Sequence, residues 1–275
     1  MLIAIEDDFD LNKIAVSGQC FRWERLAAGS YRIIHGSQCL HITEAGENRY
    51  DLDCSEADYE RVWRDYFDLP ENYASMRGRI DRRHDSFLWN AAEHEKGIRI
   101  LRQDPWETLV SFIISQNKNI PAIQRSIRLL AERCGEAKTD QQGKTYYAFP
   151  TPEGILSLSE SDLRECGLGY RCAYARAAAR AVAEGQIDLN ALKTAGEEKT
   201  IAELMKLYGV GVKVANCVSL FGLHHIDAFP QDVWIKRILC SEYPNGYPFE
   251  TYAPYNGVYQ QYMFAYYRHL ENKKA

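Results

Sequence analysis

The strongest constraint on the fold is a change in hydrophobic period at Ser55. Before it, residues 19–53 contain four short apolar or aromatic runs separated by glycine-containing turns, a pattern typical of antiparallel strands. After it, SEADYERVWRDYF opens with a capping serine and repeats its apolar residues at helical spacing. The sequence therefore predicts an α+β fold class: a small N-terminal antiparallel sheet with flanking helices over residues 1–98, then an all-helical body over 99–275.

Three segments of the body carry local signals. Asp104-Pro105-Trp106-Glu107 places a cap, a proline at the first helical position and a glutamate able to reciprocate the cap, so a helix is predicted from there. Residues 135–152 are polar and rich in turn formers, which predicts a surface excursion. The alanine-rich stretch 170–184 predicts a further helix.

The composition is that of an ordinary globular protein, with 46% hydrophobic and 26% charged residues among 275. No apolar run approaches the roughly 18 residues of a membrane span. The opening MLIAIEDDFDL has neither a basic leader nor a small-residue cleavage site, so we expect no signal peptide and a cytoplasmic location. Nothing in the sequence suggests more than a monomer.

The eight cysteines are scattered and form no CxxC pair, the spacing common in zinc and iron–sulfur sites. We therefore expect reduced, mostly buried thiols, no metal and no cofactor. The net charge of −5 argues against a protein that binds nucleic acid over its whole surface. A local basic face stays open, because a compact site needs only a few phosphate contacts.

Residues 201–240 are the most informative stretch, since they read as a helix, a YGVGV hairpin and a second helix. Gly209 and Gly211 permit a tight turn whose backbone N–H groups point outward. Beside a helix N-terminus, such groups suit a phosphate without a basic side chain. Two glycines alone, however, favour an ordinary helical hairpin in the core.

Lys213 and Asp232 add chemistry to this hairpin. Lys213 falls in the first turn of a helix, where the positive end of the helix dipole disfavours a cation and so favours the neutral amine that a nucleophile needs. A solvated surface lysine is an equally good interpretation of this residue alone. Asp232 follows Pro230 at the start of the next helix, where it suits both an N-cap and a carboxylate facing a developing positive charge.

The pattern of helix, Gly-Val-Gly hairpin, Lys213 and a later Pro-x-Asp-Val resembles the helix–hairpin–helix superfamily of DNA glycosylases. With a lysine at this position, the chain resembles the bifunctional branch of the superfamily. The absence of a C-terminal four-cysteine cluster separates it from most endonuclease III and adenine-glycosylase relatives. SGQCFRW at 17–23, SFIISQNKNI at 111–120 and CGLGYR at 166–171 resemble the 8-oxoguanine DNA glycosylase/lyase family, as a bacterial variant.

This resemblance implies a DNA repair enzyme whose partner is double-stranded DNA containing oxidised guanine. Lys213 would attack C1′ of the flipped nucleotide, form a Schiff base and lead to β-elimination. Asp232 would stabilise the transition state. The backbone carbonyl of Gly18 would accept the N7 hydrogen that 8-oxoguanine has and guanine lacks.

The remaining implied roles divide between the flipped base and the gap it leaves. Cys217 and Phe264 would sandwich the base, and Gln260 would read its Watson–Crick edge. Without the resemblance, Phe264 fits core packing equally well. The residues implied around the gap are Asn117, which fills it, Tyr170, which wedges beside the orphaned base, and Arg171, which bonds the orphaned cytosine.

The chain departs from the family pattern at three positions. Tyr208 precedes Gly209 where the family has proline, which changes stiffness more than chemistry. Ala122 falls where the family has an arginine that helps to select cytosine, so we expect a relaxed opposite-base preference. Trp234 replaces a common histidine, so a phosphate contact is lost or replaced by stacking.

Two other functions remain as alternatives. The first is a monofunctional glycosylase for alkylated bases, which would have no lysine at the hairpin and could form no covalent adduct. The second is a non-catalytic DNA-binding module that uses the hairpin only as a phosphate clamp. Lys213 and the SGQCFRW segment count against both.

Overall fold

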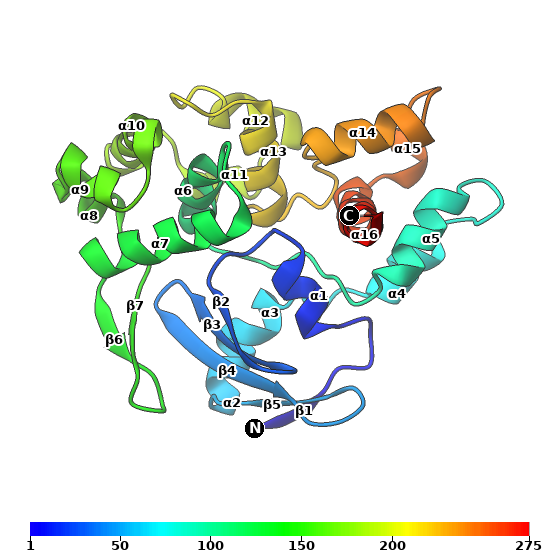
Figure 1. Ribbon diagram of the computed structural model, residues 1–275, viewed down its shortest axis with the longest axis horizontal. Helices are drawn as coiled ribbons and strands as arrows, with labels where there is room; N and C mark the ends of the chain where they lie inside the picture. The colour runs from blue at the N-terminus through cyan, green and yellow to red at the C-terminus, as the bar shows by residue number, and fades with distance from the viewer. Residues whose placement is uncertain (275) are drawn as a thin grey trace.

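The computed structural model describes residues 1–274, and the side chains of residues 1–271. Its N-terminal part is a five-stranded antiparallel sheet in the order β1-β5-β4-β3-β2 (Figure 1). The strands are β1 (Leu2–Ala4), β2 (Trp23–Ala27), β3 (Ser30–His35), β4 (Gln38–Glu44) and β5 (Arg49–Leu52). The four predicted strands are confirmed, whereas β1 was not predicted because three residues show no alternation.

One face of the sheet is covered by aromatic and apolar side chains. Ile33 on β3 pairs with Leu40 on β4, and both are fully buried. They join a cluster with residues of α1 (Leu11–Val16) and of the helical run made by α2 (Glu56–Asp58), the π-helical turn η1 (Tyr59–Trp63) and α3 (Arg64–Tyr66). The helix predicted after Ser55 is therefore present, because its aromatic residues close this small core.

The helical body lies above the sheet in Figure 1 and holds the larger hydrophobic cluster. Its helices are α6 (Pro105–Ser115), α7 (Ile120–Cys134), α8 (Pro152–Ser157), α9 (Glu160–Glu165), α10 (Cys172–Ala183), α11 (Leu189–Leu192), α12 (Glu197–Leu204), α13 (Val212–Phe221), α14 (Val233–Glu242), α15 (Phe249–Tyr252) and α16 (Asn256–Lys274), with a 3₁₀ turn η2 (Gly169–Arg171) before α10. None of the helices among the described residues is long and apolar enough to cross a membrane.

Two helices from the first hundred residues pack with this body. They are α4 (Tyr73–Gly78) and α5 (Ser86–His94), and α5 lies against α16 (Figure 1). Asp85 at the start of α5 accepts hydrogen bonds of 2.9 Å from the hydroxyls of Tyr243 and Tyr252. The larger core therefore draws on both ends of the chain. The division into units 1–98 and 99–275 stays a prediction.

The start of helix α6 confirms the predicted cap, but the predicted reciprocal bond from the glutamate is absent among the described residues. Asp104 accepts the N–H of Glu107 at 2.8 Å, and Pro105 is the first helical residue. The Glu107 carboxylate does not reach back to the cap, since it faces Arg22 at 3.2 Å. It is largely shielded, with 14% of its side chain exposed, and desolvation raises its pKa to about 7. The reciprocal cap was wrong because a buried arginine is the stronger partner for this carboxylate.

Two further expectations need correction. Residues 135–152 are not a plain excursion, because they form a hairpin of β6 (Ala137–Thr139) and β7 (Thr145–Tyr147) that docks on the sheet. The Tyr146 hydroxyl donates to the carbonyl of Ser37 at 2.9 Å, and Tyr146 itself is buried. The eight thiols are free, but only four are buried, three are half-buried and Cys240 is exposed.

Candidate active site

Lys213 is the second residue of α13 and follows directly on the glycine hairpin. The N-cap of this helix is Gly211, so no cap side chain accepts from the first turn. The Lys213 ammonium lies 5.2 Å from the centre of the Phe112 ring, which α6 supplies. No role was predicted for Phe112, because its position depends on the packing of α6 against α13.

Asp232 is the N-cap residue of α14, and its Oδ1 accepts the N–H of Ile235 at 2.9 Å. The charges of Asp232 and Lys213 both act on the thiol of Cys217. Burial raises the pKa of the Cys217 thiol, the nearby Lys213 ammonium lowers it, and the Asp232 carboxylate raises it. The structure therefore places Lys213 and Asp232 close to the buried thiol of Cys217.

Gly18 lies against Phe264 of α16, and Gln260 stands one turn earlier on the same helix. Gly18 has φ of +83°, and a side-chain carbon there would lie 3.4 Å from the Phe264 ring. Gln260 is buried and donates through Nε2 to the carbonyl of Pro230 at 2.9 Å. Because Pro230 precedes Asp232 by two residues, this bond ties α16 to the loop that carries the carboxylate.

The backbone next to Gly18 is held by Gln19, a residue of the SGQCFRW segment for which no role was predicted. The Gln19 Nε2 donates to the carbonyl of Arg99 at 2.8 Å, and its Oε1 accepts the N–H of Leu101 at 2.8 Å. Gln19 is buried, so these bonds fix the loop rigidly.

Asn117, Tyr170 and Arg171 form a second group at the ends of α6 and η2. The Asn117 Nδ2 donates to the Tyr170 hydroxyl at 3.0 Å, and Tyr170 is 50% exposed. Arg171 is buried, and its guanidinium donates to the carbonyls of Gln116, through Nε at 2.8 Å, and Leu168 at 3.2 Å. A contact between Arg171 and an unpaired base would compete with these carbonyls.

The hairpin before α13 depends on Gly209, which has φ of +84°. A side-chain carbon at Gly209 would overlap the Tyr174 ring, whereas one at Gly211 would meet open space. The carbonyl of Gly209 accepts from Gln116 Nε2 at 3.1 Å, which joins the hairpin to the end of α6. Tyr208, the residue in place of the family proline, is 64% exposed and stacks edge-on against Tyr174.

Trp234 lies on the first turn of α14, with the Arg237 guanidinium 5.1 Å above its ring. Val233, beside it, is 64% exposed. The start of α14 thus presents an apolar and aromatic surface next to the Asp232 cap. Stacking, the second outcome considered for Trp234, stays a prediction.

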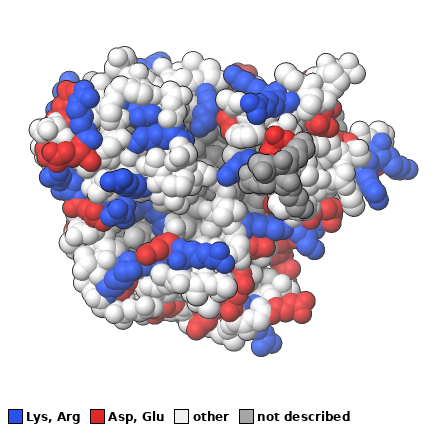
Figure 2. Space-filling model, viewed as in Figure 1, with Lys and Arg blue, Asp and Glu red and all other residues white. Residues whose placement is uncertain are grey.

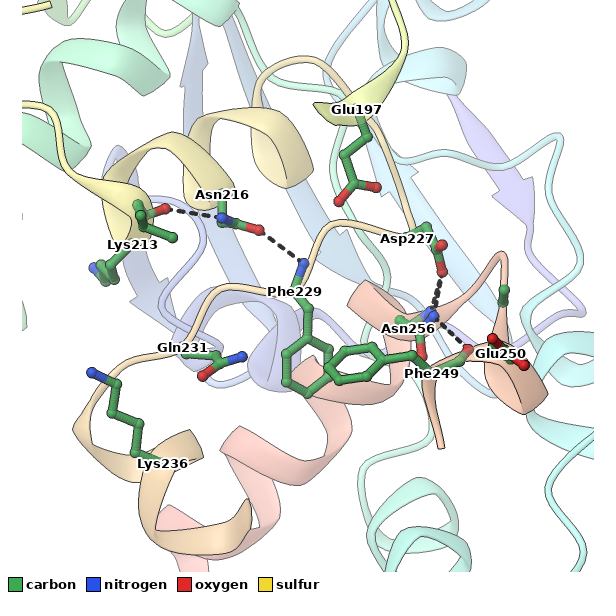
Figure 3. Close-up of a pocket in the computed structure, with 12 residues that line it drawn as sticks. Glu197, Lys213, Asn216, Asp227, Phe229, Gln231, Lys236, Phe249, Glu250 and Asn256 are labelled. Carbon is green, nitrogen blue, oxygen red and sulfur yellow. Dashed lines mark hydrogen bonds between the residues drawn. The ribbon is translucent and has the colours of Figure 1, made fainter. Parts of the chain in front are cut away.

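A cavity of about 550 Å³ opens beside Lys213, between α13, α14 and the start of α16. Figure 3 shows the Lys213 and Lys236 amines on one side of it and the carboxylates of Glu197, Asp227 and Glu250 on the other. Asn216 spans α13 and the next loop, since its Nδ2 donates to the Val212 carbonyl at 2.9 Å and its Oδ1 accepts the Phe229 N–H at 3.2 Å.

Basic side chains gather near the centre of the face shown in Figure 2, although the chain as a whole is acidic. Figure 2 shows Lys and Arg side chains along α7 and around the hollow at the centre of this face. Arg125 and Arg128 are exposed residues of α7. The local basic face that the net charge left open is therefore present.

Comparison with known proteins gives family matches over most of the chain. Residues 1–109 match the N-terminal domain of 8-oxoguanine DNA glycosylase, and residues 110–245 match the HhH-GPD superfamily of base excision DNA repair proteins. A probable N-glycosylase/DNA lyase of Methanothermobacter thermautotrophicus is 32% identical over 86% of this chain and 83% of its own length.

Two further relatives differ in how much of them is covered. The N-glycosylase/DNA lyase of Saccharomyces cerevisiae is 41% identical over 54% of this chain, and the match spans only 42% of the yeast protein. The 8-oxoguanine glycosylase/lyase of Clostridium acetobutylicum, solved with double-stranded DNA containing cytosine opposite 8-oxoG, superposes with a TM-score of 0.89. It is 33% identical, with 98% of both chains covered.

Proposed function

The chain belongs to the 8-oxoguanine DNA glycosylase family of the HhH-GPD superfamily, and we propose that it excises 8-oxoguanine from duplex DNA and then cleaves the strand as a lyase. The observation that carries the proposal is Lys213 in the uncapped first turn of α13, grouped with Asp232 around Cys217. A monofunctional enzyme or a DNA-binding module has no use for this lysine.

The Lys213 amine is the nucleophile. Its lone pair forms a bond to C1′, the glycosidic bond breaks, and its electrons leave with the base, which takes up a proton. Ring opening gives a Schiff base between Nζ and C1′. Loss of a C2′ proton then expels the 3′ phosphate, which is β-elimination. Asp232, held by its bond to Ile235, faces the positive charge that develops on the sugar.

The flipped base enters beside Gly18. The Gly18 carbonyl accepts the N7 hydrogen, Cys217 and Phe264 sandwich the ring, and Gln260 reads its Watson–Crick edge. The contact geometry of Gly18 with Phe264 supports this arrangement, as does the bond from Gln260 to the loop before Asp232.

The DNA around the lesion is held by two groups. The backbone N–H groups at Gly209 and Gly211 bind a phosphate at the open start of α13. Asn117 fills the gap in the duplex, Tyr170 wedges beside the orphaned base, and Arg171 bonds an orphaned cytosine after leaving its carbonyl partners.

The opposite base is read loosely, because Ala122 lies on the first turn of α7 where the resemblance implies an arginine. We expect excision opposite adenine, guanine and thymine at rates within a few-fold of cytosine. A hundredfold preference for cytosine in single-turnover assays would contradict this. We further propose a monomer in the bacterial cytoplasm, associated with the nucleoid when bound to DNA.

Borohydride trapping tests the proposed function directly. A duplex with one 8-oxoguanine opposite cytosine should yield a covalent adduct with the wild type and none with Lys213→Gln. Lys236→Gln is the matched control, because Lys236 lines the same cavity from α14 and should leave trapping intact. No adduct on this duplex, but release of an alkylated base from a second duplex that carries one, would support the monofunctional alternative. Tight DNA binding without any product would support the binding module.

A further inference from the structure

A cluster of potential metal ligands lies where the β6–β7 hairpin meets the sheet. Cys39 and His41 alternate on β4, so their side chains project to the same face. Asp140 comes from the turn between β6 and β7. The Cys39 sulfur, one His41 ring nitrogen and one Asp140 carboxylate oxygen all lie within 4.8 Å of one another.

The Asp140 carboxylate is oriented by its own turn. Its Oδ1 accepts the N–H groups of Gln142 at 3.1 Å and Lys144 at 2.8 Å. Its Oδ2 is thereby directed toward His41, whose Nε2 lies 3.5 Å away. The Asp140 side chain is only 2% exposed, and the guanidinium of Arg32 lies 2.9 Å from Oδ2. A carboxylate oxygen has a second lone pair, which this ion pair leaves for a metal ion.

His41 is held in the orientation that a ligating histidine needs. Its Nδ1 lies 3.4 Å from Oδ2 of Asp53, on the side of the ring away from Asp140. Metal-bound histidines commonly donate their second ring N–H to a carboxylate, which fixes the tautomer and the ring plane. Asp53 can hold Nδ1–H in this way and leave Nε2 to face Cys39 and Asp140.

We propose that Cys39, His41 and Asp140 bind a divalent transition-metal ion, Zn²⁺ foremost, with water as the fourth ligand. Thiolate, imidazole and carboxylate are the donors that Zn²⁺ takes in a tetrahedral site. In a tetrahedral site with metal–ligand bonds of about 2.0–2.1 Å, two ligand atoms lie about 3.3 Å from each other. The His41–Asp140 separation of 3.5 Å already matches it. The sequence concealed this site because its third ligand follows the first two by a hundred residues without a CxxC pair.

Arg32 sets the strength of the site. Its Nη2 lies 2.9 Å from Asp140 Oδ2 and donates to the carbonyl of Thr145 at 3.1 Å. The second lone pair of Oδ2 is available to a metal ion, but the positive charge of the guanidinium repels a metal cation. We therefore expect an affinity below that of all-cysteine structural sites. A bound ion would fasten the hairpin to β4 and so stabilise the fold.

Cobalt substitution tests the site on the full chain after treatment with a chelator. Titration with Co²⁺ should produce a thiolate-to-cobalt charge-transfer band and tetrahedral d–d bands at one ion per chain, and Zn²⁺ should abolish them. Cys39→Ser should lose the charge-transfer band. Cys54→Ser should keep it, because Cys54 is another half-buried thiol that lies outside the cluster.

A second variant guards against misfolding of the first. Asp140→Asn keeps the Oδ1 acceptor for its turn, so its circular dichroism should match the wild type, while its Co²⁺ affinity should fall at least tenfold. Zn²⁺ should raise Tm of the wild type and Cys54→Ser more than that of Asp140→Asn. Absence of a charge-transfer band in the wild type, or its persistence in Cys39→Ser, would overturn the proposal. Neither result depends on glycosylase activity.

Discussion

Helices α13 and α14 begin in opposite ways, although both starts belong to one site. Helix α13 starts at Gly211, which offers no cap, and it carries Lys213 in its first turn. Helix α14 starts at Asp232, whose carboxylate accepts the N–H of Ile235 at 2.9 Å. One helix start leaves its amides for an acceptor from outside the chain, whereas the other fixes a negative charge in place.

The two helix starts suit different groups of the DNA. Open amides at the positive end of a helix suit a DNA phosphate, and a carboxylate already bonded to the backbone suits a developing cation because it needs no reorganisation. The comparison fails if the cap at Asp232 matters only for folding, or if the open start of α13 does not bind DNA.

The largest effect is expected for Asp232→Asn, which separates charge from capping. Asparagine is also a good N-cap, so the free energy of unfolding should change by less than about 0.5 kcal/mol. Single-turnover excision should fall by about 10²–10³-fold, because the positive charge on the sugar loses its partner. Asp232→Ala, which loses both, should also lose about 1 kcal/mol of stability. Full activity in the asparagine variant, measured on 8-oxoguanine duplexes, would reduce Asp232 to a structural cap.

A third helix start, that of α6, holds a largely shielded carboxyl group, and we expect an unusual pH dependence of stability from it. Burial raises the pKa of Glu107 to about 7 from an ordinary 4.5, despite Arg22 beside it and with the Asp104 charge adding to the shift. Between these values the unfolded chain is ionised while the folded chain holds its proton. Stability should therefore fall as pH rises through this window, by at most about 3 kcal/mol.

Urea denaturation from pH 4.5 to 7.5 measures this effect, with Glu107→Gln as the reference. The difference in unfolding free energy between the two proteins should move against the wild type as pH rises. Above pH 7 it should level off, since both states are then ionised. A difference independent of pH would mean that the ion pair with Arg22 keeps Glu107 charged throughout.

The open start of α13 also depends on the turn before it. Gly209→Ala adds a carbon that overlaps the Tyr174 ring at φ of +84°, so we expect a loss of about 3 kcal/mol and weaker DNA binding. Gly185→Ala is the matched control, because Gly185 has φ of +68° with nothing within 4 Å. It should lose about 1 kcal/mol from the backbone alone. Equal losses in thermal unfolding would mean that Tyr174 moves aside.

The sequence predicted those features that local chemistry determines. The Asp104-Pro105 cap predicted the start of α6, and short apolar runs between glycine-containing turns predicted four strands, but the three residues of β1 are too short a run to stand out. The packing of α5 on the body was hidden, because the bonds from Tyr243 and Tyr252 to Asp85 join residues far apart in the chain.

The site divides in the same way. Lys213 and Asp232 stood out because their types are informative at helix starts and because the surrounding motifs resemble a family. Phe112 beneath the lysine and Gln116 behind the hairpin did not, since an apolar residue of α6 and the residue that follows this helix are ordinary until tertiary packing places them. Glu107 was predicted to complete the cap of α6, but in the structure it pairs with Arg22, the residue just before β2.

The smallest effect is expected when α13 is given the kind of cap that α14 has. This substitution is also the sharpest test of the difference between the two helix starts. Gly211 has φ of −96° and ψ of 177°, which aspartate adopts freely, and its surroundings are open. Gly211→Asp should therefore keep or raise stability by a few tenths of a kcal/mol. Its carboxylate would occupy the amides and repel phosphate, so Kd for duplex DNA should rise about tenfold, or about 1.4 kcal/mol.

Gly211→Asn separates the two causes, because its amide occupies the same N–H groups without charge. Fluorescence anisotropy at several salt concentrations should give it a smaller loss of affinity than aspartate, and a shallower dependence on salt than the wild type if a phosphate contact is gone. If both variants bind DNA as tightly as the wild type, the amides of α13 do not contact the backbone. Its missing cap would then serve only to let Lys213 approach the sugar.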